Sequence, residues 1–181
     1  MAVPAVKPAP EVRLRPAVPR DAELLRRWRG EPEVRRFQPL ADLSVGQLRT
    51  DIAGHRLPDL YRGRGEKFQW VVEVDRRPAG WITLVVSNWE HGLAEVGYAL
   101  STVYQGRGVM TAALGELVRE LFRRTAIERL EARCAVGNEA SARVLEKLGF
   151  LREARLRRYF RLGGERVDNF LYALLRTDYL G

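Results

Sequence analysis

Residues 95–111 read EVGYALSTVYQGRGVMT, a stretch that combines a strand, a glycine turn and the start of a helix. Large side chains at Val96, Tyr98 and Leu100 alternate with smaller ones, which is the period of a β-strand. Further on, the apolar positions recur at helical spacing, at Met110, Ala113, Leu114, Leu117, Val118, Leu121 and Phe122. We therefore expect a strand that turns directly into an amphipathic helix starting near Arg107.

Two glycines, Gly106 and Gly108, stand between the predicted strand and the predicted helix. Without a Cβ atom, a glycine lets the backbone approach a ligand closely. The first N–H groups of a helix have no partner within the helix and lie at the positive end of its dipole, so they favour an anion such as a phosphate. A tight connection that binds no ligand explains these residues equally well.

Two familiar phosphate-binding motifs do not fit this turn. A P-loop requires Lys and then Ser or Thr after its second glycine, where this chain has Val109 and Met110. A Rossmann turn requires Gly or Ala where Thr111 stands, and an acidic residue that closes the next strand. The available acids, Glu128 and Glu131, stand where that strand opens. The turn is therefore of another kind.

The sequence QGRGVM at residues 105–110 resembles the pyrophosphate loop of the GCN5-related N-acetyltransferases (GNAT), which follows a Gln/Arg-x-x-Gly-x-Gly/Ala pattern. The last position is Met110 here, a departure that looks like the RimJ/RimL-like branch of ribosomal-protein N-terminal acetyltransferases. A second segment, GNEASARVLEKLGF at residues 137–150, supports the likeness. Asn138 and Gly149 are a good N-cap and a good C′ residue for one helix, which a purely structural role explains. The same Asn-x-x-Ser segment ending in Gly-Phe also resembles the second hallmark of the family.

The resemblance covers nearly the whole chain after residue 10 and is weakest before Phe68. It implies an α+β (α/β) fold with a GNAT-like mixed, mostly antiparallel central sheet flanked by helices. We expect a flexible N-terminal arm at residues 1–10 and a single N-acetyltransferase domain at residues 11–181. Residues 151–162 and 165–175 should form a terminal hairpin around the two-residue turn Gly163-Gly164.

The segment before Phe68 should hold a strand at residues 12–18 and several short helices. Asp21 would lie in the first turn of a helix over residues 21–28, where acidic side chains are favoured. Ser44 and Gln47 have the spacing of a capping box, which predicts the start of another helix. In the resembling family these first helices form one wall of the acceptor site, so they should carry much of the substrate choice.

Bulk composition supports a single globular domain, since 46% of the 181 residues are hydrophobic and 30% are charged. The one cysteine, Cys134, excludes an intrachain disulfide, and no Cys/His cluster has zinc-ligand spacing. No apolar run approaches the roughly 18 residues that span a bilayer, and residues 1–10 are unlike a signal peptide. We therefore expect a cytoplasmic protein with no metal site and no membrane partner.

The formal net charge of +8 and the pI near 10.2 favour acidic partners, such as nucleic acid, an acidic protein or a polyanionic cofactor. No known nucleic-acid-binding module is visible in the sequence. A solvated basic surface is therefore the preferred interpretation of the arginine clusters. Association with the ribosome or RNA, and a homodimer, stay open.

The resemblance implies acetyl-coenzyme A as the co-substrate, with its pantetheine arm along the strand and its pyrophosphate over the glycine turn. The residues implied to bind it are Leu100, Ser101, Val103, Gln105, Gly106, Arg107, Gly108, Val109, Met110, Thr111, Asn138 and Ser141.

Acetyl transfer requires a neutral amine held beside the thioester carbonyl, so the incoming ammonium must lose a proton. Glu95 is the candidate general base, and the alternative is a surface glutamate at a strand end. Many relatives use a tyrosine as the acid where this chain has Leu145. Ser141 is the candidate that hydrogen-bonds the leaving sulfur, while Tyr159 or Tyr172 would require the hairpin to fold back. The thiolate can also leave unaided, because thiol pKa values lie near 8.5.

The sequence thus predicts an acetyl-CoA-dependent N-acetyltransferase that acts on a primary amine, with a protein N-terminal α-amino group as the leading acceptor. An acetyltransferase for a small-molecule amine is the first alternative. A non-catalytic acyl-CoA-binding module and a ribosome- or RNA-associated protein are the others.

Overall fold

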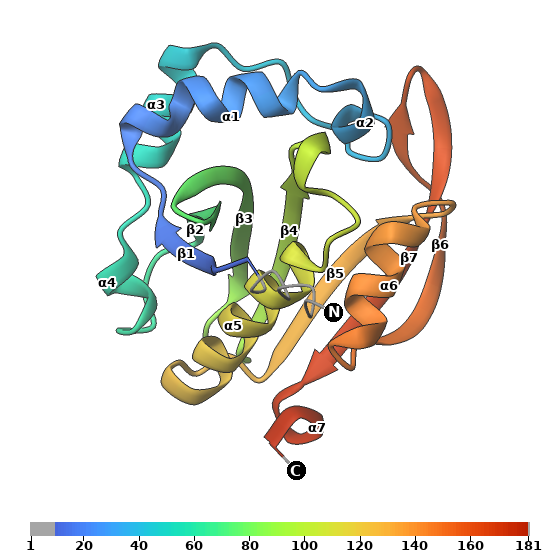
Figure 1. Cartoon of the computed structure of the whole chain (residues 1–181). Helices are drawn as coiled ribbons and strands as arrows, with labels where there is room; N and C mark the ends of the chain where they lie inside the picture. The colour runs from blue at the N-terminus through green and yellow to red at the C-terminus, as the bar shows by residue number, and fades with distance from the viewer. Residues whose placement is uncertain (1–9, 181) are drawn as a thin grey trace, which may run out of the picture.

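A seven-stranded sheet, in the order β1-β2-β3-β4-β5-β7-β6, forms the centre of the protein (Figure 1). The structure is a computed structural model that describes residues 10–180. The predicted N-terminal arm therefore lies, except for residue 10, outside the described residues. The strands are β1 (Val12–Pro16), β2 (Lys67–Val74), β3 (Arg77–Asn88), β4 (Leu93–Leu100), β5 (Arg129–Ala135), β6 (Leu151–Leu162) and β7 (Glu165–Leu175). Among the described strands, only β4 and β5 run parallel, which confirms the predicted mixed, mostly antiparallel sheet.

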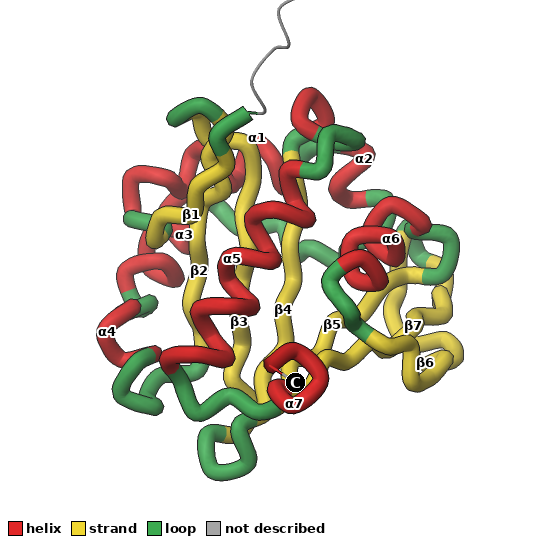
Figure 2. Tube along the Cα trace, turned by 60° about the horizontal axis from the view of Figure 1, so that its bottom comes forward, coloured by secondary structure: helices red, strands yellow, loops and turns green. Residues whose placement is uncertain are grey.

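Helices cover both faces of this sheet (Figure 2). They are α1 (Ala22–Arg29), α2 (Pro32–Arg35), α3 (Val45–Ala53), α4 (Leu57–Leu60), α5 (Val109–Arg124), α6 (Glu139–Lys147) and α7 (Arg176–Leu180), with short 3₁₀ turns η1 (Pro19–Asp21) and η2 (Thr102–Tyr104). None of the helices within residues 10–180 is long and apolar enough to cross a membrane.

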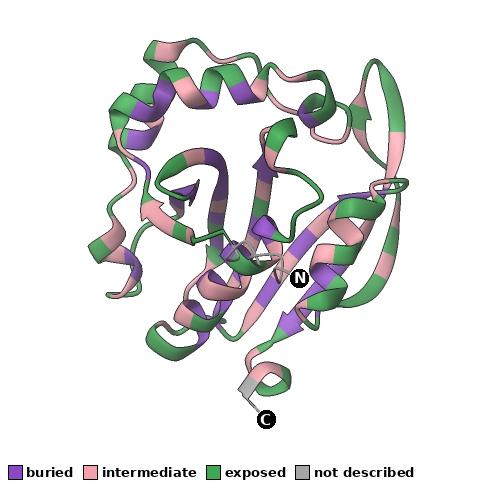
Figure 3. Cartoon of the chain, viewed as in Figure 1, coloured by how far each residue is buried: buried purple, intermediate pink, exposed green. Residues whose placement is uncertain are grey.

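Two hydrophobic clusters, one on each face, hold the layers together (Figure 3). The helix α5 buries its apolar stripe against β2, β3 and β4, and its Leu114 and Phe122 are fully buried. On the opposite face, α1 and α3 pack through a smaller cluster in which Trp28 and Trp81 stack with ring centroids 6.3 Å apart. The sheet thus separates two helix layers, α5 with α6 on one face and α1 with α3 on the other.

The parallel strands β4 and β5 pair over only three positions. Leu93, Ala94 and Glu95 lie opposite residues 129–131, and the two strands part beyond that point. The edge of β4 from Val96 to Leu100 therefore has no strand partner among the described residues. An opening in the middle of the sheet results, with the start of α5 and α6 on one side of it.

The terminal hairpin has the predicted bounds and the predicted turn. Gly163 and Gly164 both take positive φ angles, 58° and 90°, as a two-residue hairpin turn of this kind requires. A bulge interrupts β6 between Leu156 and Phe160. Arg158 has φ +52° there, and its N–H donates to Asp168 Oδ1 at 2.7 Å. The bulge bends the outer strand of the sheet.

Two boundaries differ from the predictions for backbone reasons. The first strand ends at Pro16 rather than at residue 18, because the chain enters the 3₁₀ turn η1 at Pro19. The long helix begins at Val109, two residues after the predicted start, because Gly106 and Gly108 have φ angles of +72° and +74°. Those left-handed angles are incompatible with a right-handed helix.

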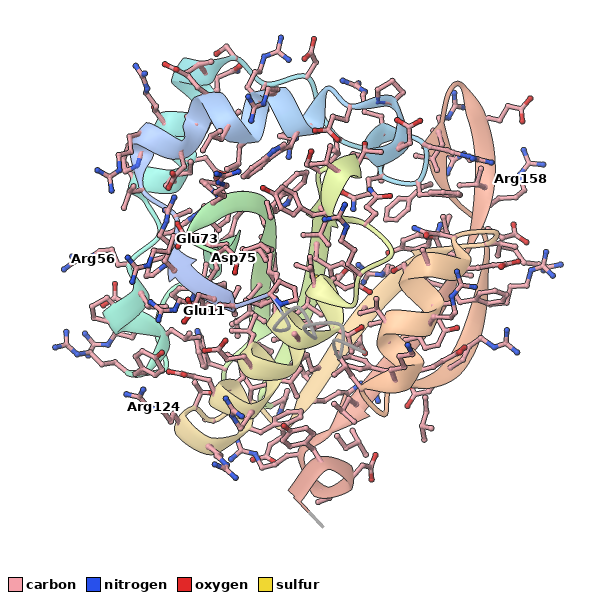
Figure 4. The ribbon with its side chains drawn as sticks, in the orientation of Figure 1. Glu11, Arg56, Glu73, Asp75, Arg124 and Arg158 are labelled. Atoms are coloured by element: carbon pink, nitrogen blue, oxygen red, sulfur yellow. The ribbon has the colours of Figure 1, made fainter. Side chains whose placement is uncertain are left out.

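Arg15 ties β1 to the start of α1 and to β2. Its guanidinium donates two hydrogen bonds to Asp21, at 2.7 and 2.8 Å, and one to Glu73 at 2.7 Å. Asp21 is only 3% exposed and also accepts from the N–H of Val18. It therefore fixes the turn that precedes α1 rather than lying inside that helix. Figure 4 labels Glu73 close to β1.

Replacing Asp21 with asparagine should destabilise the fold by about 1–3 kcal/mol at pH 7, because the hydrogen bonds of Arg15 lose a charged acceptor. Burial opposes ionisation of Asp21, but the bonds from Arg15 and Val18 outweigh it and hold the pKa below its usual range. Stability from this carboxylate is present above the unfolded pKa and is lost as pH falls through the lower folded pKa. The difference between wild type and Asp21→Asn, measured by urea unfolding, should therefore shrink on acidification.

The matched control for this test is Asp42→Asn. Asp42 pairs with Arg26 at 2.8 Å, but its side chain is 68% exposed. Exposed pairs contribute at most about 1 kcal/mol. Equal losses in the two variants would contradict a special role for Asp21.

Candidate active site

The backbone of the glycine turn after η2 is open to solvent at Gly106 and Gly108. A Cβ atom added at Gly106 or Gly108 would meet nothing within 4 Å. Gly108 is the N-cap residue of α5, and no side chain of the described residues caps the helix there. The first N–H groups of α5 therefore lie beside open space at the positive end of a helix, which suits a phosphate group.

The side chains that follow the turn point into the protein. Val109 and Met110 are 2% and 5% exposed and belong to the cluster under α5. The methionine at the last position of the motif therefore packs in the core and leaves the loop open. Arg107 is exposed and Thr111 is half-buried.

The free edge of β4 holds the next group of predicted residues. The carbonyl of Tyr98 accepts a hydrogen bond from Gln38 Nε2 at 2.6 Å, and the carbonyl of Leu100 accepts one from Gln105 Nε2 at 2.9 Å. Both carbonyls thus point away from β3. The N–H groups of Tyr98 and Leu100 face the same side, since both backbone groups of a residue in an antiparallel pair do so. This edge can pair with an amide-containing ligand.

The backbone N–H of Ser101 points toward β3 and not toward the free edge of β4. Its N–H donates to the carbonyl of Ala79 on β3 at 2.8 Å, and its hydroxyl donates to Glu31 at 2.8 Å. Glu31 also accepts from the N–H and the hydroxyl of Thr102. The N–H of Ser101 is therefore not at the open edge, whereas Val103 is 65% exposed beside the glycine turn.

On the other side of the opening, Asn138 caps α6 as predicted. Its Oδ1 accepts from the N–H of Ser141 at 3.2 Å, and its amide nitrogen has no partner within residues 10–180. The hydroxyl of Ser141 lies 2.9 Å from the hydroxyl of Tyr98. Cys134 is buried nearby, as expected for a small core residue, with Sγ 3.4 Å from the carbonyl of Asn138.

The sequence pattern indicated Ser141 but not its partner, Tyr98. The signal was present, because Tyr98 is a polar aromatic residue on the same strand face as Val96 and Leu100, the face that packs under α5. Burial raises the pKa of Tyr98, although the bond with Ser141 opposes this rise. The phenol therefore stays protonated and can share a proton with Ser141.

Tyr159 and Tyr172, the two tyrosines considered from the sequence, lie elsewhere. The hydroxyl of Tyr172 donates to Glu146 at 3.0 Å, and burial together with this carboxylate raises its pKa to about 12. Tyr159 lies under the guanidinium of Arg133, 5.2 Å from it. Neither hydroxyl is joined to Ser141 by a hydrogen bond.

Glu95 is the last residue of β4 that pairs with β5. It faces away from α5, because its neighbours Ala94 and Val96 both belong to the cluster under that helix. Burial raises the pKa of the Glu95 carboxyl, and an ion pair with Arg133 opposes the rise. Two residues further along the same face, a Cβ atom at Gly97 would meet nothing within 4 Å. A half-buried carboxylate thus lies beside an open space.

A groove of about 820 Å³ lies between the segment around α2 and the terminal hairpin. The loop after α2 lines one side of it, the end of β5 forms the floor, and the tip of the terminal hairpin lines the other side. Gln38, which bonds to the free edge of β4, belongs to the same lining. The groove and the free strand edge therefore adjoin.

Acetyl-CoA fits these features. The uncapped start of α5 suits its phosphates, the free edge of β4 suits its pantetheine amides, and the amide nitrogen of Asn138 remains available as a donor. The acetyl thioester supplies the group to be transferred. Within residues 10–180 no cluster of His, Cys, Asp and Glu side chains could hold a metal ion.

Residues 11–151 match the family described as "Acetyltransferase (GNAT) domain". The chain belongs to this family and is an acetyl-CoA-dependent acetyltransferase. This assignment confirms the resemblance seen in the two sequence motifs. The protein is therefore an enzyme rather than a non-catalytic binding module.

Curated relatives include an uncharacterised N-acetyltransferase, p20, of Bacillus licheniformis, which is 28% identical over 89% of this chain and 90% of its own length. A ribosomal protein uS5-alanine N-acetyltransferase of Escherichia coli is 32% identical, but over only 46% of this chain and 43% of its own.

Solved structures share the fold. Mycobacterium smegmatis RimJ in complex with a CoA disulfide is 28% identical, with a TM-score of 0.80 over 93% of this chain and 83% of its own. A spermidine N-acetyltransferase of Vibrio cholerae, with CoA and spermine, has a TM-score of 0.82 at 19% identity over 94% and 98% of the two chains.

Gly108→Glu should abolish the binding of acetyl-CoA and leave the fold largely intact, because it places a side chain and a negative charge at the start of α5. The side chain has room, although the φ of +74° adds some strain. Gly164→Glu is the matched control, since Gly164 also has a positive φ, 90°, and open space. Calorimetric titration with acetyl-CoA should give no binding to the first variant and wild-type affinity for the second. Unchanged affinity in Gly108→Glu would remove the assignment of this turn.

Proposed function

We propose that the protein acetylates the N-terminal α-amino group of a protein, with Glu95 as the general base. The observation that carries this proposal is the position of Glu95, half-buried at the last paired rung of β4 and β5 and beside the open space at Gly97. A carboxylate with a raised pKa is a better proton acceptor than an ordinary glutamate. An amine that enters from the groove would meet this carboxylate at the opening in the sheet.

The pKa of the amine supports an α-amino acceptor. An α-amino group titrates near 7.7–8.0 and is roughly one-tenth neutral at pH 7, whereas a lysine near 10.4 is neutral at only about one part in 2,500. A site with a single carboxylate base suits the group that loses its proton more easily.

The relatives also support a protein acceptor, although they include more than one kind. The uS5-alanine enzyme acts on a ribosomal protein, as its name says, and the Vibrio cholerae neighbour acts on spermidine. The spermidine enzyme is too distant in sequence to support more than the fold. A small-molecule amine is the alternative acceptor.

The departing thiolate would lie toward the other side of the opening, where Ser141 and Tyr98 share a hydrogen bond of 2.9 Å. Ser141 would donate a hydrogen bond to the sulfur and accept one from Tyr98, whose phenol stays protonated. This pair would stabilise the departing thiolate at the site of the acidic tyrosine that the resemblance implies, where this chain has the fully buried Leu145.

Glu95→Gln should lower kcat by roughly 10²-fold or more at pH 7, because glutamine keeps the shape but cannot accept a proton. The wild-type rate should fall as the pH drops through the raised pKa of Glu95, since the carboxyl is then protonated. The rate of the variant should not show this fall at low pH. The difference in kcat between variant and wild type should shrink as the pH rises and free amine becomes available. Steady-state kinetics between pH 5 and pH 9 measure both effects.

The control is Glu131→Gln, which removes the carboxylate directly opposite on β5. Glu131 pairs with Arg129 and should leave the rate near that of wild type. If Glu95→Gln kept wild-type rates at pH 7, Glu95 would be a structural residue only.

Peptides with a free N-terminus and a small first residue should be acetylated at the α-nitrogen, and N-terminally blocked peptides that contain lysine should be at least tenfold poorer. The amine pKa values give the direction of this preference. Mass spectrometry of the products locates the acetyl group. Modification confined to lysine, or turnover with polyamines or aminoglycosides alone, would refute the α-amino proposal and leave the acetyltransferase assignment intact.

A further inference from the structure

The charged side chains that line the groove beside the opening in the sheet are all positive. Three arginines line it, Arg35 and Arg36 from α2 and the loop after it, and Arg161 from β6. No aspartate or glutamate lines it. Figure 1 shows α2 beside the tip of the terminal hairpin, so segments far apart in the sequence supply this charge from two sides.

None of the three guanidinium groups is neutralised by a described residue. Arg35, Arg36 and Arg161 are all exposed and form no ion pair within residues 10–180. Arg36 lies over the ring of Phe37 at 5.0 Å, which orients it without removing its charge.

Two carboxylates of the segments around the groove, Glu33 of α2 and Glu165 of β7, are exposed but lie outside its lining. Two others are engaged in hydrogen bonds. Glu31 accepts three hydrogen bonds from Ser101 and Thr102, and Asp168 accepts from Arg155 and from the N–H of Arg158. Arg158 itself lies on the outer edge of the hairpin and points away from the body of the protein (Figure 4). The arginines of the groove are thus separate from those of the outer surface.

We infer that the groove selects acceptors that carry acidic side chains within the first few residues after the reacting amine. This inference rests on the proposed function and specifies its substrate class. Guanidinium groups bind carboxylates with charge-assisted hydrogen bonds, and Arg has the geometry to do so through two bonds. Three like charges around the groove repel a polycationic acceptor such as a polyamine.

The test compares three peptides that differ only after an N-terminal serine, one with Asp-Glu-Asp, one with the isosteric Asn-Gln-Asn and one with three lysines. The acidic peptide should have a kcat/KM at least tenfold above that of the neutral peptide, and the lysine peptide should be the poorest of the three. High salt should reduce the acidic preference, because exposed charges are screened.

The triple variant Arg35→Gln, Arg36→Gln, Arg161→Gln should lose the preference while it still acetylates the neutral peptide. All three side chains are exposed, so the fold should be preserved. The matched control is Arg62→Gln, Arg119→Gln, Arg123→Gln, which removes the same net charge from exposed, unpaired positions outside the groove. This control should keep the preference of wild type.

The outcomes separate this inference from the proposed function. Equal rates for the acidic and neutral peptides, or the same loss of preference in both triple variants, would overturn the inference and leave α-amino acetylation standing. If no peptide is acetylated at its α-nitrogen, calorimetric binding of the same peptides to the CoA-loaded enzyme still tests the groove. Tighter binding of the acidic peptide supports the inference in that case, and equal or weaker binding overturns it.

Discussion

The parting of β4 and β5 after the pair Glu95 and Glu131 is the constraint on which the rest of the site depends. A sheet that stayed paired would bury the edge of β4 and separate its two faces completely. Because the strands part, the N–H groups of Tyr98 and Leu100 have no strand partner among the described residues, and both helix layers adjoin the same opening. The cluster under α5 and the stacked Trp28 and Trp81 hold β4 in place while its neighbour diverges.

This opening gives the two faces different chemistry. The face under α5 and α6 presents N–H groups, a capping asparagine and the hydroxyls of Tyr98 and Ser141. The opposite face presents the carboxylate of Glu95 and the arginine-lined groove. A polyanionic co-substrate and a protonated amine would otherwise attract one another or compete for the same groups. With the proposed sites, the sheet would keep them on opposite sides and let them meet only at the gap.

Local signals in the sequence predicted the fold well. The capping box of Ser44 and Gln47 is present, with bonds of 2.9 and 3.2 Å, and the paired glycines 163 and 164 form the predicted turn. Such features depend on neighbours a few residues apart, so the sequence contains them directly. The pair of Tyr98 with Ser141 and that of Arg133 with Glu95 join residues 43 and 38 positions apart. They depend on which strand faces are brought together, which periodicity alone does not specify.

The hydrogen bond from Gln38 to the carbonyl of Tyr98 links the groove on one face of the sheet to the edge of β4. It joins a residue that lines the groove to the strand edge that would hold the other substrate. Glu31, bonded to Ser101 and Thr102, makes a second link between the same two segments. If a ligand on one side changes the affinity for a ligand on the other through these links, the second ligand changes the affinity for the first by the same factor, since binding free energies are reciprocal. One amide and one carboxylate would then couple the binding of the two substrates.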